Sequence, residues 1–107
     1  MSGKRAEIAR GNDFFALSDS VGFNAKNTPS DVIKVGVVMT EEEKKSNSRP
    51  GLTPSASFDP LLGYTVEKFQ KARVPQIDGT LKPGGPTINA LQKSVGSRFA
   101  GVRAMRT

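Results

Sequence analysis

The sequence predicts a chain that is mostly irregular or extended, with a few short α-helices, one possible strand and little autonomous core. Only 36% of its 107 residues are hydrophobic, and it contains no Trp. It has 11 Gly and 7 Pro, two residue types that interrupt helices and strands and are typical of turns. A chain this short also buries a smaller fraction of its surface than a longer one. We therefore expect residues 1–107 to form a single non-globular or marginally globular chain.

The N-terminal segment, residues 1–45, begins with a predicted helix over 2–17. Ser2 can cap its first turn, because a serine hydroxyl accepts a hydrogen bond from a free backbone N–H. Ile8 and Phe15 lie seven residues apart and would share one helix face. The helix is followed by a stretch rich in Ser, Asp, Asn and Gly, which indicates turns.

Residues 32–39 form the best strand candidate of the chain. Five of them are β-branched, which favours a pleated strand: Val32, Ile33, Val35, Val37 and Val38. A lone strand cannot satisfy its own backbone donors and acceptors, so it needs a second strand or the edge of a partner's sheet. The alternative is a helical turn that leads into the charged run TEEEKK, where the capping-box spacing of Thr40 and Glu43 predicts one or two exposed helical turns.

A Pro- and Ser-rich linker is predicted over 46–60, with three prolines and five Ser or Thr residues. Phe58 would anchor it to a neighbouring surface. A helix over 60–73 follows, with Asp59 at the cap and Pro60 at its first position. Its apolar face would be formed by Leu62, Val66 and Phe69.

The basic helical segment over 61–107 ends in the clearest predicted helix, 87–106. Its apolar residues recur at spacings of three and four: Ile88, Leu91, Val95, Phe99 and Val102. Arg98 and Arg103 flank this stripe, and Arg106 extends it. Such a helix suits an apolar groove with an acidic rim, because an Arg stem covers apolar surface while its guanidinium meets a carboxylate. The alternative is that the stripe packs on the protein's own core.

The residues predicted to bind a partner combine this helix with two anchors elsewhere: Ile88, Leu91, Val95, Arg98, Phe99, Val102, Arg103, Arg106, Phe58 and Phe69. The chain has 16 Lys and Arg against 10 Asp and Glu, a net charge of +6, which favours an acidic partner. We therefore predict an accessory, structural subunit of a large assembly, laid over an acidic protein scaffold. Two alternatives stay open: a subunit that contacts RNA, and a small soluble regulator that binds one partner through its C-terminal helix.

The sequence offers few groups for catalysis. It contains no His and no Cys, which removes the usual nucleophile–base pairs and metal-ligand sets. We therefore expect no enzyme activity, no metal, no cofactor and no small-molecule substrate. No apolar run approaches the ~20 residues of a membrane span, and no signal-peptide pattern is apparent. We accordingly expect an intracellular protein that is not secreted.

Overall fold

Three α-helices and two short 3-10 helices make up most of the part of the chain that the computed structural model describes, residues 11–46 and 52–99. Their order is η1 (Gly11–Phe15), α2 (Pro29–Lys45), α3 (Pro60–Arg73), α4 (Pro86–Val95) and η2 (Gly96–Phe99). About 59% of these residues are helical and none lies in a strand. An isolated antiparallel bridge joins Val21 to Leu81.

The predicted extended chain with little core is wrong. Fifteen hydrophobic residues are buried together between the helices: Phe15, Leu17, Val21, Val32, Val35, Val38, Met39, Leu62, Val66, Phe69, Leu81, Ile88, Leu91, Val95 and Phe99. The Cα radius of gyration is 13.4 Å, close to the ~13 Å of a compact 100-residue domain. The low hydrophobic fraction misled the prediction because the apolar residues that are present converge on one core.

The predicted strand over 32–39 is also wrong, because these residues form the middle of α2. Val32, Val35 and Val38 recur every three residues, and all three are buried on the inward face of the helix. Ile33, which a strand would place on the same face as Val35, is 42% exposed. Burial on a helical period outweighs the small preference of valine for strands. The alternative, a helical turn leading into the charged segment, comes closer, but α2 is one helix of 17 residues that runs through both segments.

Helix starts follow the local sequence closely. Pro29, Pro60 and Pro86 each occupy the first turn of an α-helix, where a missing N–H is harmless and the fixed φ is helical. The Asp59 carboxylate accepts a hydrogen bond from the Leu62 N–H at 3.0 Å and caps α3. The helix predicted over 60–73 is therefore confirmed.

Within the described residues, the two terminal helices are less regular than predicted. Of the helix expected over 2–17, the described part contains only η1 and a loop, and residues 1–10 lie outside the described residues. The helix expected over 87–106 is regular only through α4, and it tightens to 3-10 geometry at Gly96. Residues 100–106 lie outside the described residues. A glycine weakens helix continuation, which accounts for the change at this point.

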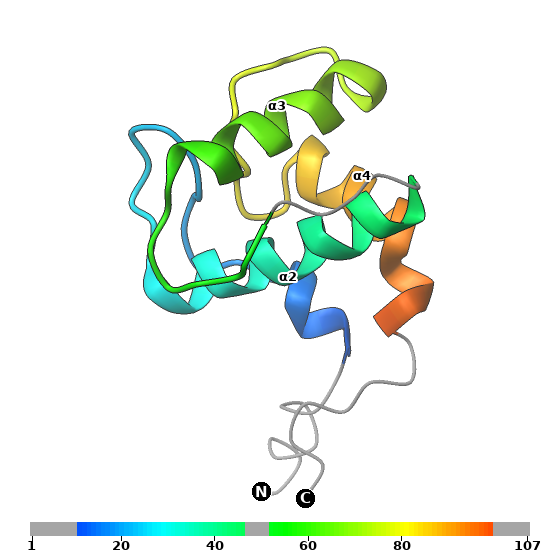
Figure 1. The fold of residues 1–107 in the computed structure, drawn as a ribbon, viewed down its shortest axis with the longest axis horizontal. Helices are drawn as coiled ribbons and strands as arrows, with labels where there is room; N and C mark the ends of the chain where they lie inside the picture. The colour runs from blue at the N-terminus through cyan, green and yellow to red at the C-terminus, as the bar shows by residue number, and fades with distance from the viewer. Residues whose placement is uncertain (1–10, 47–51, 100–107) are drawn as a thin grey trace, which may run out of the picture.

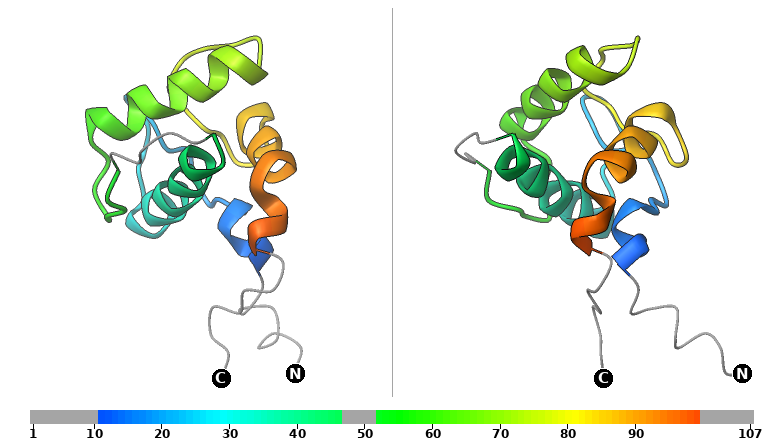
Figure 2. Two further views of the ribbon diagram at one scale, coloured as in Figure 1. Left: turned by 45° about the vertical axis from the view of Figure 1, so that its right-hand side comes forward. Right: turned by 90° about the vertical axis from the view of Figure 1, so that its right-hand side faces the viewer.

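The helices surround the core from different sides (Figures 1 and 2). α2 packs against α4 and η1, and α3 covers the end of the core opposite η1 and η2. The two 3-10 helices meet through aromatic rings, because the Phe99 ring lies 4.9 Å from Phe14 and 5.5 Å from Phe15. Residues 52–59, the described part of the predicted linker, cross α2 where Pro54 packs on Gly36. This arrangement leaves one long face of α3 directed away from the core.

Candidate functional site

The outward face of α3 carries an exposed row of side chains, which we call the α3 stripe: Leu61, Tyr64, Lys68 and Lys71. Spacings of three, four and three residues place them on one side of the helix. Leu61 is 50% exposed and Tyr64 is 60% exposed, and both lysines reach solvent. Four large hydrophobic residues of the described ranges are exposed, and the two most exposed of them belong to the stripe. The stripe is therefore apolar in its first half and basic in its second.

Packing on the opposite face of α3 determines which way the stripe points. Leu62, Val66 and Phe69 are buried in the core, and Gln70 is buried beside them at 1% exposure. Once these residues face inward, helical geometry turns the stripe outward. The sequence predicted the inward face of α3 and therefore also indicated which residues face outward. These outward residues were not singled out as a binding site.

Tyr64 is held on one side by an aromatic cluster. The Phe23 ring lies 5.5 Å from the Tyr64 ring and 5.4 Å from the Phe58 ring. The absence of a side chain at Gly63 makes room for this cluster, because a Cβ there would overlap the rings of Phe23 and Phe58. Tyr64 thus combines a supported ring with an exposed surface, a combination typical of binding anchors.

Few acidic side chains of the described residues pair with the lysines in the basic half of the stripe. Lys68 Nζ lies 3.8 Å from Glu43 Oε2, a loose ion pair in which the lysine side chain is 67% exposed and the glutamate side chain 14% exposed. Among the residues that the structure describes, Lys71 has no ion-pair partner. The Arg73 guanidinium sits 5.4 Å above the centre of the Phe69 ring, in a cation–π contact. Positive charge at this end also complements the C-terminal pole of the helix dipole.

The residues predicted to bind a partner lie mainly inside the fold. Ile88, Leu91, Val95 and Phe99 are buried at 5% exposure or less, as is Phe69. The stripe of the C-terminal helix therefore packs on the protein's own core, the alternative that the sequence left open. A partner could reach these side chains only by displacing the other helices.

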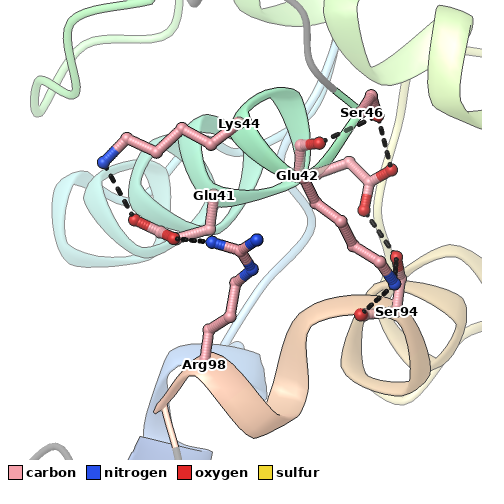
Figure 3. Close-up of polar contacts among 7 residues, drawn as sticks. Glu41, Glu42, Lys44, Ser46, Ser94 and Arg98 are labelled. Atoms are coloured by element: carbon pink, nitrogen blue, oxygen red, sulfur yellow. Dashed lines mark hydrogen bonds and ion pairs between the residues drawn. The ribbon is translucent and has the colours of Figure 1, made fainter.

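The remaining predicted partner-binding residues are divided between the surface and the undescribed end. Arg98 donates a hydrogen bond from Nη1 to Glu41 Oε1 at 3.1 Å, so the carboxylate facing it belongs to its own chain (Figure 3). Phe58 is half-buried against Phe23. Val102, Arg103 and Arg106 lie outside the described residues.

The excess positive charge of the chain is unevenly placed. The described ranges contain ten Lys or Arg and nine Asp or Glu, a net charge of +1. Residues 1–10, 47–51 and 100–107 contain six Lys or Arg and one Glu, and so contribute the remaining +5 of the chain's net +6. Electrostatic attraction by the described fold therefore depends on local clusters such as Lys68 and Lys71 rather than on its net charge.

The described surface offers limited room for a small ligand. A hollow of about 150 Å³ between α2 and α3 is lined by Glu43, Lys68, Phe69 and Arg73 among others, and it is small beside typical ligand pockets of ~300–1,000 Å³. Within residues 11–46 and 52–99, no His, Cys, Asp and Glu groups gather in a metal-binding set. Buried side-chain polar atoms of these ranges all have hydrogen-bond partners. The α3 stripe is thus the most distinctive surface feature, and its chemistry suits binding.

None of the helices in the described ranges combines the length and apolar character needed to cross a membrane. Comparison of the chain with protein-family models, with curated proteins and with solved structures gives no match.

Proposed function

We propose that this protein is a non-catalytic binding module, an accessory subunit that docks on an acidic protein surface through the α3 stripe. The observation that carries the proposal is the exposure of Tyr64 and Leu61 next to two lysines on one helix face. An exposed aromatic supported by neighbouring rings loses little conformational freedom on binding and can bury a large area. Nearby lysines steer a partner of opposite charge and restrict its orientation.

A protein partner suits this surface better than a nucleic acid. Binding to a phosphate backbone depends on many basic contacts, whereas the α3 stripe offers two lysines beside two apolar side chains. Leu61 offers an aliphatic contact, which matches an apolar side chain of a protein. The lack of cysteine fits a reducing compartment, so we place the protein inside the cell.

The proposal is tested by following the native chain through size fractionation of a cell extract, with and without nuclease. A double variant, Leu61→Ser with Tyr64→Ser, is compared with a control variant, Ile77→Ser. Ile77 is 47% exposed and lies outside the α3 helix, so it controls for the loss of an exposed apolar side chain.

The wild type and the Ile77→Ser control should travel in a nuclease-resistant particle, and the double variant should elute as a small protein. The proposal fails if the double variant stays in the particle. It also fails if nuclease releases the wild type, because the partner would then be a nucleic acid.

A further inference from the structure

We infer that the α3 stripe binds an amphipathic acidic helix that lies antiparallel to α3, with its acidic residues preceding its apolar ones. This inference rests on the proposed function and specifies its partner. The stripe has a direction, because Leu61 and Tyr64 occupy the N-terminal half of α3 while Lys68 and Lys71 occupy the C-terminal half. At 1.5 Å per residue the stripe extends over about 15 Å, the length of two to three helical turns.

The antiparallel orientation follows from electrostatics. A partner helix opposite in direction to α3 would bring its N-terminal residues to Lys68 and Lys71. Acidic residues near an N-terminus also stabilise the partner's own helix, because they complement its dipole. In a parallel arrangement the acids would have to lie at the C-terminal end of the partner, where they destabilise it. The two helix dipoles also attract each other when antiparallel.

The side chains between the members of the stripe allow close approach of a second helix. Thr65 and Ala72 are small, and both lie on the same side of α3 as the stripe. The Thr65 hydroxyl already donates a hydrogen bond to the Leu61 carbonyl at 2.8 Å, so its burial leaves no donor unpaired. The charged groups on this face are Lys68, Lys71 and the flanking Glu67, and polar groups of the partner would have to compensate them on burial.

Spacing on the partner follows from the spacing on α3. Along the antiparallel partner, successive side chains face Lys71, then Lys68, then Tyr64 and then Leu61. Their spacing must therefore be three, four and three residues. The partner would therefore carry acids at positions i and i+3, and apolar residues at i+7 and i+10. The weak pair between Lys68 and Glu43 would be exchanged for a pair with the partner.

The test titrates the full-length chain, labelled with ¹⁵N, with three synthetic peptides of equal length. The first has two Glu followed by two Leu at the stated spacing on an Ala- and Gln-based helix. The second has the same composition with the Leu pair first, and the third replaces both Glu residues by Gln. Affinity is measured by calorimetry, and the binding site is mapped by amide shifts.

The acid-first peptide should shift the resonances of residues 61–72 and bind at least tenfold more tightly than the other two. The variant Lys68→Glu with Lys71→Glu should lose this preference and bind a peptide with Lys in place of Glu. Its thermal melt should fall modestly, because the change at Lys68 brings a second carboxylate near Glu43 and both changes oppose the helix dipole. Its amide spectrum should remain that of the folded protein.

Equal affinity for the acid-first and apolar-first peptides would overturn the inference, as would shifts centred away from α3. A second copy of the chain or a single-stranded RNA oligomer that shifts the same resonances at lower concentration would also overturn it. The proposed function stands apart from these outcomes, because it depends on whether loss of Leu61 and Tyr64 releases the chain from its particle.

Discussion

Ser94 on α4 donates a hydrogen bond of 2.6 Å from Oγ to Oε1 of Glu42 on α2, and Glu42 is buried, with 6% of the residue exposed. Ser46 contacts the other carboxylate oxygen at 3.4 Å. Lys45 reaches across from α2 and donates to the Ser94 carbonyl at 2.6 Å. Polar contacts thus connect the C-terminal end of α2 to the C-terminal end of α4 (Figure 3).

Replacing Ser94 by Ala should destabilise the protein by about 1.5–3 kcal/mol, the typical value for a hydrogen bond to a charged group. The mutation leaves one oxygen of a buried carboxylate without its closest donor. Ser97→Ala is the matched control, since Ser97 is exposed on η2 and should change stability by less than ~0.5 kcal/mol. Urea denaturation of both variants measures the difference. Equal stability of the two would show that Glu42 is not held by Ser94.

Gly63→Ala should destabilise the protein by about 1–3 kcal/mol, because the added Cβ would overlap the rings of Phe23 and Phe58. Gly96→Ala is the control. Its Cβ would meet only Gln92 Cγ at 3.4 Å, and alanine favours the helical backbone found there. The melting temperature of Gly63→Ala should therefore fall, and that of Gly96→Ala should rise or stay unchanged. Fluorescence of Tyr64, the single tyrosine of the chain, should change in Gly63→Ala alone.

Gln70→Leu should destabilise the protein by at least about 2 kcal/mol, because the buried Gly79 N–H and Thr87 hydroxyl would lose their hydrogen-bond partner. Gln70 Oε1 accepts hydrogen bonds from the N–H groups of Asp78 and Gly79, at 3.0 and 2.8 Å. Its Nε2 donates to Thr87 Oγ1 at 3.0 Å. Hydrogen exchange of the Asp78 and Gly79 amides should accelerate in this variant. Gln92→Leu, on the exposed side of α4, should leave both amides protected.

Val35→Thr and Ile33→Thr form a matched pair that tests the helical register of α2. Val35 is fully buried, so an added hydroxyl there should cost about 1–3 kcal/mol. Ile33 is 42% exposed, so its replacement should cost less than ~1 kcal/mol. A strand would place both residues on one face, and they would then respond alike. Similar losses in chemical denaturation would contradict the helix.

Several features of this protein follow from short stretches of sequence. Asp59 and Pro60 start α3, and Val74 followed by Pro75 ends it, because caps and prolines act within a few residues. The apolar stripe of Ile88, Leu91 and Val95 likewise predicted α4 from spacing alone. Local rules of this kind do not depend on what the rest of the chain does.

Tertiary structure decided the features that depend on distant contacts. The backbone preferences of the valines in α2 differ between helix and strand by less than ~1 kcal/mol each, whereas burying each valine contributes about 1.5–3 kcal/mol. Packing against α4 and η1 therefore determined that α2 is a helix.

The same reasoning applies to the binding surface. The sequence determined that Ile88, Leu91 and Val95 share a face, but only the assembled core determined that this face is buried. The α3 stripe remains on the surface because Leu62, Val66 and Phe69, on the opposite side of α3, pack into the core. The spacing of the inward face already indicated which residues of α3 would point outward. Only the folded protein shows that no other described element covers Leu61 and Tyr64, because exposure depends on the whole packing arrangement.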